Sequence, residues 1–396
     1  MKTNLLVFIP EFPRLSETFI QREVAGLLKR NNLNIAVLSI KKGEALLTKE
    51  LTAVTHYIKL TPKVIILGMY HFFTKHPLRT FIVLISGVFN SPKYLVKSFG
   101  FAYLAKDYSP THIHVHFLSD FSTYGMYMSR LLGVTFSISA HARDVFVNAH
   151  LVSLKAKYCK FIAVCNVNAY EQLLTQVIDP FKDKIHLLYH GLDVENLFSN
   201  IKIEPKPDIP LIYMGGLRLV SKKGISYAIK ASKLLKDRGI KHKFIAVGAQ
   251  GDLYNELQAE ILDLDLKNTF YILGNGNGLP HTDVLAYYLK AQVFVFSGIK
   301  SEEGDVDGVP NVLLEAAAAK LPCVVTDVGS VKDIVEHGVT GFIVPQKDPK
   351  NIARAVEVLL QDKSKRELLG ERIYAKVAKL FDNKETLSKL EELLCE

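Results

Sequence analysis

Short apolar runs alternate with amphipathic segments along this chain, and they do so in two separate series. The first series comprises the runs at 4–9, 34–40, 112–117, 135–139, 160–164 and 184–189. The second comprises the runs at 210–214, 243–247, 269–273, 292–296, 322–326 and 341–345. Buried strands that alternate with helices are typical of parallel sheets covered by helices on both faces. The pattern therefore predicts an α/β protein with two doubly wound, Rossmann-like domains.

The segment between the two series has the composition of a linker. Residues 200–210 (NIKIEPKPDIP) hold three prolines and mixed charges without any periodicity. We therefore expect a first domain over 1–200 and a second over 201–380. A last amphipathic segment, 384–395, follows the second series. A domain that has already closed its sheet does not need this segment for its own core, so we treat 381–396 as a separate helix.

The bulk composition is that of a globular protein from a reducing compartment. Hydrophobic residues make up 48% of the 396 residues and charged residues 22%. The four cysteines stand at 159, 165, 323 and 395, a spacing that fits neither a zinc site nor a redox pair. The apolar run near the N-terminus is too short for the core of a signal peptide. These features favour a cytoplasmic location.

Most of the net charge of +9 comes from one stretch, residues 51–106, which contain seven Lys or Arg and no Asp or Glu. The same stretch holds two apolar runs, 64–73 and 80–89, each well short of the ~20 residues that span a bilayer. Apolar runs beside basic residues suit a segment lying on an anionic membrane surface. Two ordinary core helices with solvated lysines would give the same pattern. No nucleic-acid-binding motif accompanies the charge, so we expect no nucleic-acid partner.

An anion-binding pattern follows the first strand of the second series. The sequence GGLRLVSKKGI begins with Gly215 and Gly216, which we expect to open a turn, and places Arg218 and Lys223 before the next helix. Two cations near a helix N-terminus can bind phosphate groups, because their charge adds to that of the helix end. An exposed basic turn would have the same sequence, so both interpretations stay open.

The stretch DGVPNVLLE, residues 307–315, places two carboxylates on either side of a turn. The turn presents backbone N–H groups at the start of a helix, which suits an anionic ligand. Glu315, one turn into the helix, can accept hydrogen bonds from vicinal hydroxyls, and Asp307 can face a second polyhydroxylated group. The loop lacks the alternating ligand spacing of a calcium site, so no metal is expected. A phosphate centre between two such groups describes a nucleotide sugar.

The region 307–349 resembles the donor-site signature of glycosyltransferase family 4, in which two acidic residues flank a Gly-x-Pro turn. RLVSKKG resembles the Arg…Lys-Gly phosphate site of that family. FPRLSETFIQREVAGL, HIHVHF, SISAHARDVF and YHGLDVENLF resemble the N-terminal half of its bacterial exopolysaccharide enzymes of the colanic-acid type. The resemblance covers most of the chain and is weakest across 41–110.

This resemblance implies the GT-B fold, in which two Rossmann-like domains face each other across an interdomain cleft and the last helix crosses back to the first domain. It implies a retaining transfer of a sugar from a UDP- or GDP-sugar to a lipid-linked or saccharide acceptor in bacterial surface polysaccharide biosynthesis. The first domain would bind the acceptor and the second the donor. No metal and no other cofactor is implied. An acceptor in the bilayer would keep the protein peripheral at the inner face of the membrane.

The resemblance also assigns roles to residues by position. Arg218 and Lys223 would neutralise the donor diphosphate, and Glu315 would bind the ribose hydroxyls. Asp307 would contact the donor sugar, and His141 matches the histidine near the reaction centre, so that His141, Asp307 and Glu315 are the catalytic candidates. The donor pocket would be lined by Gly308, Val309, Pro310, Asn311 and Val312. Stabilisation of the departing diphosphate by fixed cations would be the main catalytic effect.

Candidates on the acceptor side come from the first domain. Ser16 can cap the helix predicted over 16–30, and Glu17 lies in its first turn. The three histidines of HIHVHF alternate, so they face one side of a strand. They could bind zinc, but the simpler interpretation is packing against the neighbouring layer. Only His116, nearest the carboxyl end, is expected to approach the cleft.

Two departures from the family pattern leave alternatives open. Asp307 stands where the family has Glu, and it is one methylene shorter. Lys320 stands where the family often has Gly. A non-catalytic partner subunit that binds a nucleotide sugar would tolerate both changes, and a nucleotide-sugar epimerase on the same fold is a further alternative.

Overall fold

The structure is a computed structural model of the chain, and it describes residues 2–14, 17–44, 47–249, 251, 253–302, 306 and 308–395. The chain forms two compact units, one of Met1–Gly191 together with Asn383–Glu396 and one of Leu192–Asp382. The division after Gly191 lies ahead of the linker predicted at 200–210, which belongs to the second unit.

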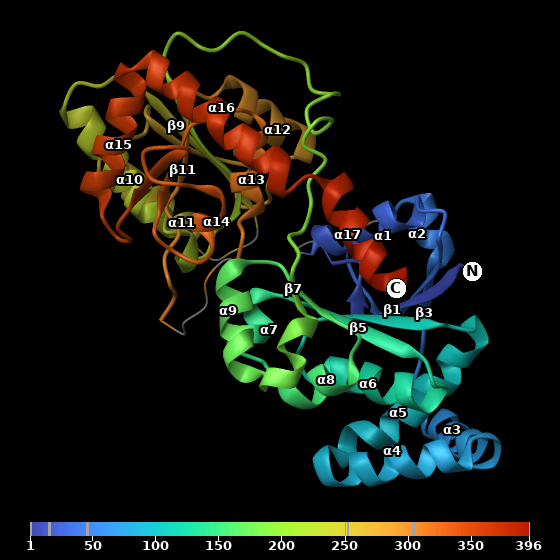
Figure 1. Ribbon diagram of the computed structural model, residues 1–396. Coiled ribbons are helices and arrows are strands. Elements are labelled where there is room, and N and C mark those ends of the chain that lie inside the picture. Colours follow the sequence, from blue (N-terminus) through green and yellow to red (C-terminus); the bar gives the residue numbers. More distant parts are fainter. Residues whose placement is uncertain are drawn as a thin grey trace. The chain divides into compact units, whose positions relative to one another are not determined.

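The first unit is built on a seven-stranded parallel sheet (Figure 1). Its strands are β1 (Thr3–Phe12), β2 (Leu33–Lys42), β3 (Thr55–Tyr57), β4 (His112–His116), β5 (Thr135–Ala140), β6 (Ile162–Val164) and β7 (Ile185–Leu187). Their order is β3-β2-β1-β4-β5-β6-β7, so the strand order reverses between β1 and β4. The sequence predicted all of these strands except the three-residue β3.

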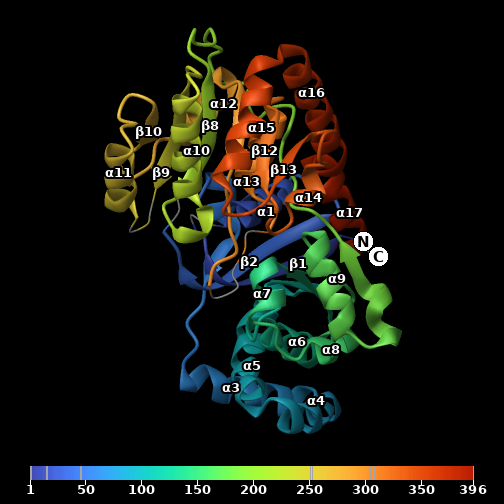
Figure 2. The same ribbon diagram turned by 90° about the vertical axis from the view of Figure 1, so that its left-hand side faces the viewer.

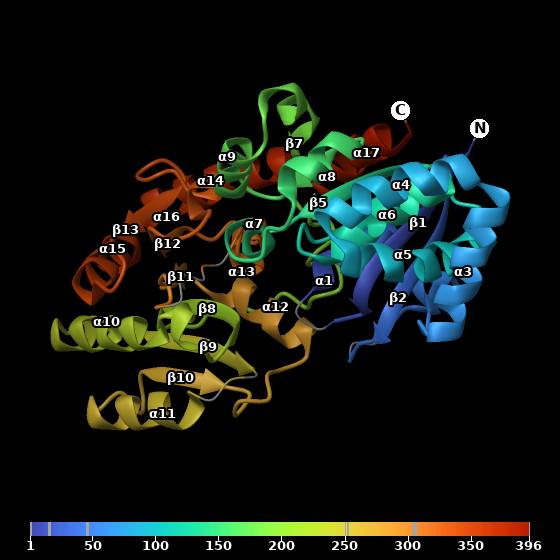
Figure 3. The same ribbon diagram turned by 90° about the horizontal axis from the view of Figure 1, so that it is seen from below.

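Helices cover both faces of this sheet (Figures 1 and 3). One core is shared with α3 (Pro62–Lys75), α4 (Pro77–Asn90), α5 (Pro92–Ala105), α6 (Phe121–Leu132), α8 (Val152–Tyr158) and α9 (Val167–Gln176). The other is shared with α1 (Thr18–Leu28), α2 (Lys49–Val54) and α17 (Asn383–Cys395). A short helix, α7 (Ala142–Phe146), follows β5, and 3-10 turns lie at Lys106–Tyr108 and Asp179–Lys184. Side chains of β1 alternate between the two cores, with Phe8 in one and Val7 in the other.

The helix α17 completes the core of the first unit, although residues 192–382 separate it in sequence from the rest of that unit. Its Leu387, Leu390 and Leu394 are buried with the apolar side chains of α1. A Cβ atom on Gly26 of α1 would lie 2.2 Å from a methyl group of Leu387, so the two helices touch where α1 has no side chain. The missing side chain therefore sets how closely α17 packs.

We expect Leu390→Ala to lower the free energy of unfolding by about 2–5 kcal/mol, because the removed buried atoms leave a cavity. Lys389→Ala changes the adjacent exposed position of α17 and should cost no more than about 0.5 kcal/mol. Urea denaturation followed by circular dichroism measures both variants. Equal stability of the two would contradict the assignment of α17 to the core.

The second unit is built on a six-stranded parallel sheet. Its strands are β8 (Leu211–Arg218), β9 (Lys243–Ala249), β10 (Phe270–Leu273), β11 (Val293–Phe296), β12 (Cys323–Thr326) and β13 (Gly341–Val344), all of which the sequence predicted. Its helices are α10 (Ile225–Asp237), α11 (Tyr254–Asp263), α12 (His281–Lys290), α13 (Asn311–Ala318), α14 (Val331–Ile334), α15 (Pro349–Gln361) and α16 (Lys363–Leu380), with a 3-10 turn at Ser221–Lys223. The strand order β10-β9-β8-β11-β12-β13 reverses between β8 and β11.

The prediction that Gly215 and Gly216 open a turn is wrong. β8 continues through both glycines and ends at Arg218. Its register against β9 shifts between Tyr213 and Gly216, and Gly215 has a φ of 80°. The glycines therefore form an irregularity like a β-bulge, which lets the strand go on beyond them. Arg218 is the last residue of the strand rather than part of the following loop.

The helices α3, α4 and α5 follow one another, each with a proline in its first turn, and α3 and α4 form the outermost layer beyond α5 (Figure 2). Few side chains of α3 and α4 are buried, so they are not ordinary core helices. The apolar surface of α3–α4 consists of the exposed side chains Ile66, Leu67, Tyr70, Phe73, Leu78, Phe81, Ile82, Ile85, Val88 and Phe89. Within the described ranges, no helix has the length and hydropathy needed to cross a bilayer.

Candidate functional site

In the second unit, the strand order points to a ligand site at the carboxyl ends of β8 and β11. Ligands of doubly wound sheets bind outside the carboxyl ends of the strands, where the strand order reverses. The segments that follow these two strands are joined by hydrogen bonds. The N–H of Ile299 donates to the carbonyl of Lys222 at 2.8 Å, and the hydroxyl of Ser297 donates to that of Lys223 at 3.2 Å. Arg218, at the end of β8, is exposed at this edge.

Lys223, the predicted phosphate ligand, lies directly before the N-cap residue of α10. It ends the 3-10 turn, and Gly224 follows as the N-cap with a φ of 61°. A Cβ atom on Gly224 would lie 2.0 Å from the carbonyl oxygen of Ser297, so only glycine allows the loop to approach β11. The Nζ atom of Lys223 lies 5.8 Å from the ring centre of Phe296. The sheet edge and the start of α10 therefore meet at this lysine, where an anion would also gain from the helix dipole.

Glu315 is a buried carboxylate with two side-chain partners. It is the fifth residue of α13 and is 8% exposed. The hydroxyl of Tyr288 donates to its Oε2 at 2.9 Å, and Nε2 of His281 lies 3.2 Å from its Oε1. Burial, and then the charge of Glu315, raises the pKa of Tyr288 well above its usual value, so the phenol stays a donor. The side chain of His281 is 62% exposed and can move aside for a ligand.

The hydrogen bond between Tyr288 and Glu315 depends on the irregularity in β8. A Cβ atom on Gly215 would lie 2.5 Å from the hydroxyl oxygen of Tyr288 and 3.0 Å from Cβ of Val312. The missing side chain at Gly215 therefore leaves the space through which the Tyr288 hydroxyl reaches the carboxylate. The positive φ of this residue also favours glycine.

The predicted donor-binding segment leads directly into α13. Gly308 and Val309 are half-buried, Pro310 is the buried N-cap, and Asn311 and Val312 begin the helix. The first N–H groups of any helix have no partner inside the helix, so this segment can present them to a ligand. Asp307, which was predicted to contact the donor sugar, lies outside the described residues.

In the first unit, His141 is held at the carboxyl end of β5. It is the N-cap of α7, and its backbone N–H donates to Oδ1 of Asp144 at 2.8 Å. The same carboxyl group accepts from the N–H of Leu118. Burial raises the pKa of Asp144 to about 7, against the effect of these backbone donors. The carboxyl group fixes the backbone on which the predicted catalytic histidine stands.

The side chain of His141 is stacked in a cluster of rings. Phe19 and Phe117 have their ring centres 4.9 Å from that of His141, and Nδ1 of His141 lies 3.1 Å from Nε2 of His190. Burial, followed by the neighbouring His190 and His116, lowers the pKa of His141 well below its usual value. His141 is therefore an uncharged imidazole at neutral pH.

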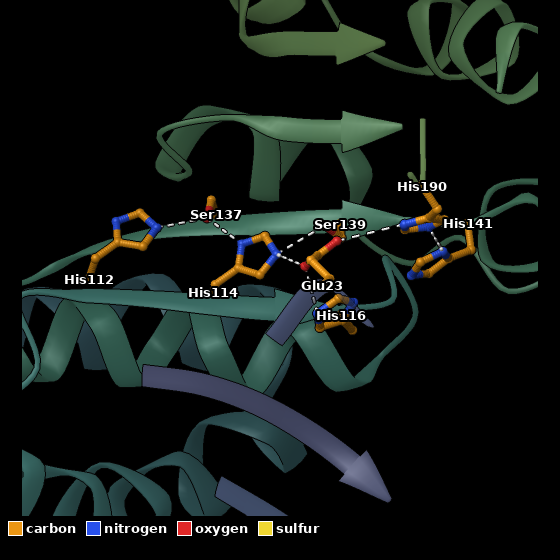
Figure 4. Close-up of polar contacts among 8 residues, drawn as sticks. All are labelled: Glu23, His112, His114, His116, Ser137, Ser139, His141 and His190. Carbon is orange, nitrogen blue, oxygen red and sulfur yellow. Dashed lines mark hydrogen bonds and ion pairs between the residues drawn. The ribbon is translucent and has the colours of Figure 1, made fainter. Parts of the chain in front are cut away.

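Glu23, on α1, is the negative group of this cluster (Figure 4). Its Oε1 lies 3.3 Å from Nε2 of His116 and 3.8 Å from Nε2 of His114, and its Oε2 lies 3.7 Å from Nδ1 of His190. Burial opposes its ionisation, but the three histidines outweigh burial and hold the pKa of Glu23 well below its usual value. The carboxylate of Glu23 thus interacts with side chains from β4 and from the segment after β7.

Hydroxyl groups of β5 link the histidines of β4. His112 lies between the hydroxyls of Thr135 and Ser137, each 2.7 Å away. His114 lies between Ser137 at 2.7 Å and Ser139 at 2.9 Å. Burial and a neighbouring histidine lower the pKa of His112 and of His114 to about 3. The prediction that the histidines of HIHVHF share one side of the strand is confirmed, and all three are buried.

The predicted acceptor-side residues stand near the start of α1. This helix runs from Thr18 to Leu28, shorter than the range predicted at 16–30. Glu17 is its N-cap residue but makes no capping hydrogen bond, and Nη1 of Arg14 donates to its Oε1 at 3.0 Å instead. Burial raises the pKa of Glu17, and Arg14 and then His116 oppose this shift. Ser16 lies outside the described residues.

The sequence interpretation missed Glu23, His190, His281 and Tyr288. A signal for Glu23 was present, because this residue occupies the same helical face as Ile20, Val24 and Leu27. A carboxylate on an apolar face must be buried with partners. A positional signal also existed for His190, which directly follows the apolar run at 184–189. His281 and Tyr288 carry no such signal, because their contacts depend on how distant segments meet.

Solved structures share this architecture over the whole chain. A glycosyltransferase from Rickettsia africae has a TM-score of 0.73 at 16% identity, covering 100% of this chain and 98% of its own. Alr3699/HepE of Anabaena, in complex with UDP, has a TM-score of 0.69 at 15% identity, covering 100% and 99%. At these identities the likeness shows the fold, and the predicted GT-B fold is confirmed.

Sequence comparison then identifies the domain family of residues 196–376. Residues 196–376 match the family model described as glycosyl transferases group 1, so the second unit of this chain is a glycosyl transferases group 1 domain. The amylovoran biosynthesis glycosyltransferase AmsK of Erwinia amylovora is 30% identical over 171 residues, 43% of this chain and 40% of its own. The putative colanic acid biosynthesis glycosyltransferase WcaL of Salmonella typhimurium is 30% identical over 213 residues, 54% and 51%. The chain spans about half the length of the curated relatives it matches.

We expect Gly215→Ala to destabilise the second unit by at least about 1 kcal/mol, because the new Cβ atom collides with the Tyr288 hydroxyl at an unfavourable φ. In a Tyr288→Phe background this collision is absent. The remaining destabilisation comes from the positive φ and from the close contact of the new Cβ atom with Val312. A double-mutant cycle by urea denaturation should therefore give a coupling energy of at least about 0.5 kcal/mol. Additive effects would contradict the proposed close approach.

Proposed function

We propose that this chain is a retaining glycosyltransferase that transfers a sugar from a UDP- or GDP-sugar to a lipid-linked or saccharide acceptor in bacterial surface polysaccharide biosynthesis. The proposal rests on the residues at the carboxyl ends of the strands in the second sheet. There, the strand order reverses between β8 and β11, Arg218 ends β8, Lys223 follows it, and α13 after β11 carries the buried carboxylate of Glu315. The names of the relatives support the pathway, and the resemblance to family 4 supports retention of configuration.

The chemistry of this edge suits a nucleotide sugar. Glu315 is buried beside two potential donors, and vicinal hydroxyls of a ribose can replace His281 as its partner. Arg218 and Lys223 supply positive charge near the start of α10, where a diphosphate gains from both the side chains and the helix end. Charge that develops on the leaving diphosphate is then stabilised by groups that are already in place. Alr3699/HepE has been solved in complex with UDP-glucose, which supports a UDP-sugar as the first donor to test.

We expect Lys223→Ala to lower kcat/KM by about a hundredfold or more, because a fixed cation at the leaving group is lost. Glu315→Gln keeps the size of the side chain but removes the charge that orders the hydroxyls, and it should weaken nucleotide binding. Lys230→Ala changes an exposed lysine of α10 and serves as the matched control. The assay measures release of nucleotide with a polyprenyl-diphosphate sugar acceptor, and NMR of the product gives the anomeric configuration.

Two outcomes of this assay would change the assignment. Wild-type activity in both variants would exclude the proposed donor site. Nucleotide binding without turnover on any tested acceptor would favour the non-catalytic subunit. A thermal-shift series with UDP, GDP and ADP separates these cases, because a ligand at 100 times its Kd stabilises the fold by about 2.7 kcal/mol.

We also propose that the first unit lies on an anionic membrane surface through the apolar surface of α3–α4. On α4, Leu78, Ile82, Ile85 and Phe89 are spaced as residues of one helix face, and all are exposed. Exposed lysines from the stretch 51–106 flank these side chains, while that stretch holds no acidic residue. Apolar side chains can enter the interface while the lysines meet anionic headgroups.

We expect the triple variant Ile82→Ser, Ile85→Ser, Phe89→Ser to lose binding to vesicles that contain phosphatidylglycerol, because its inserted apolar area is removed. The control is Ile203→Ser with Leu262→Ser, which changes exposed apolar residues of the second unit. Co-sedimentation at low and high salt measures binding. Equal binding by the triple variant and the control would exclude this surface as the membrane contact.

A further inference from the structure

Four polar atoms of the histidine cluster in the first unit are buried without a hydrogen bond. Among the described residues these atoms are Oε1 of Glu23, Nδ1 and Nε2 of His116, and Nε2 of His141. A buried polar atom without a partner destabilises the fold, so such atoms call for a water molecule, an ion or a ligand. A single ion bound to both would be a common cause for two of the four atoms, Oε1 of Glu23 and Nε2 of His116. Glu23 and His116 face each other at 3.3 Å, which places the cause between these two residues.

The hydrogen bonds along β4 determine which atom of His114 carries its proton. The hydroxyl of Thr135 donates to the carbonyl of Thr111, so it accepts from Nδ1–H of His112. With this single proton on its ring, His112 accepts at Nε2 from the hydroxyl of Ser137. Ser137 in turn accepts from Nδ1–H of His114. Nε2 of His114 is left with a lone pair, and the hydroxyl oxygen of Ser139 lies 2.9 Å from it and Oε1 of Glu23 3.8 Å from it.

Nε2 of His114 and Oε1 of Glu23 can therefore both offer a lone pair to one ion, with the Ser139 hydroxyl as the competing partner of His114. A second imidazole nitrogen, Nε2 of His116, completes the group, and the three atoms lie within 4.8 Å of one another. Tetrahedral zinc with bonds of about 2.0–2.1 Å holds its ligand atoms about 3.4 Å apart. The separations of 3.3 and 3.8 Å bracket that value.

We propose that Glu23, His114 and His116 bind one zinc ion, or another divalent transition metal that prefers imidazole and carboxylate ligands. Two β4 ligands at alternate positions and one α1 ligand form the site. The hydrogen bond from Nδ1–H of His114 to Ser137 is the support that metal-bound histidines commonly have. This ion was not expected from the sequence, where Glu23 was not among the candidates.

Two other arrangements compete for the same atoms. In the first, a proton on His116 replaces the metal and makes an ion pair with Glu23, while the hydroxyl of Ser139 donates to His114. In the second, a metal binds the neighbouring group His141, Cys165 and His190, whose donor atoms also lie within 4.8 Å of one another. A thiolate ligand distinguishes the second arrangement from the proposed site.

The proposed ion would act on structure rather than on the transfer step. It would tie α1 to β4 and would hold Glu23, whose other oxygen faces His190 and, through it, His141. It lies in the first unit, whereas the proposed phosphate ligands belong to the second. The proposal therefore stands or falls independently of the proposed glycosyl transfer.

The first test is the metal content of the full chain, purified without chelators from cells grown with added zinc. Mass spectrometry of the elements should find about one zinc ion per chain. Removal by a chelator should lower the midpoint of thermal unfolding, and added Zn²⁺ should restore it. A wild-type chain without metal, whose midpoint Zn²⁺ does not raise, would overturn the proposal in favour of the proton.

Variants locate the site. Glu23→Gln, His114→Gln and His116→Gln should each lose the metal, whereas His186→Gln, a histidine of β7 outside the group, should keep it. Unchanged metal content in all three would overturn the proposal. Should a variant fail to fold, the wild-type chain loaded with Co²⁺ decides: its visible spectrum should lack a thiolate-to-cobalt band and be unchanged by Cys165→Ser. A thiolate band that Cys165→Ser removes would place the ion at the second group and contradict this assignment.

Discussion

Both sheets of this chain are wholly parallel, and the placement of its polar side chains depends on that constraint. Every strand of a parallel sheet ends at the same edge, so residues far apart in sequence meet there once the strands are paired. In the second unit this brings Lys223, which follows β8, together with the segment after β11. In the first unit it brings His116, His141 and His190 together from the ends of β4, β5 and β7. The chemistry at each edge follows from the strand order more than from any single motif.

The fold could be read largely from periodicity, because the buried strands of parallel sheets are short apolar runs bounded by polar turns. All strands but β3 stand near their predicted positions, and β3 has only three residues with little apolar signal. The irregularity in β8 was missed, because a double glycine usually indicates a turn. Of the candidate site, the burial of Glu315 could be predicted from its helical position. Its contact with Tyr288 could not, because that contact requires the empty space above Gly215.

Positions without a side chain, or with an unusual backbone, fix the close approaches of this chain. Gly224 lets the loop after β8 touch β11, and Gly26 lets α17 touch α1. Lys320, which replaces the glycine frequent at this point of family 4, has a φ of 57° and therefore adopts the backbone of a glycine at some cost. Its side chain reaches Glu371 at 2.9 Å. The left-handed backbone at this position is thus adopted by a residue that has a side chain.

The membership of α17 in the first unit has a consequence for synthesis on the ribosome. Domains usually fold as units from the N-terminus while translation continues. Here the apolar face of α1 packs against Leu387, Leu390 and Leu394 of α17. These three residues are synthesised only after the whole second unit. During that interval the apolar side chains of α1 that α17 later covers stay exposed on the nascent first unit. The order of residues along the chain therefore makes completion of the first core the last event of folding.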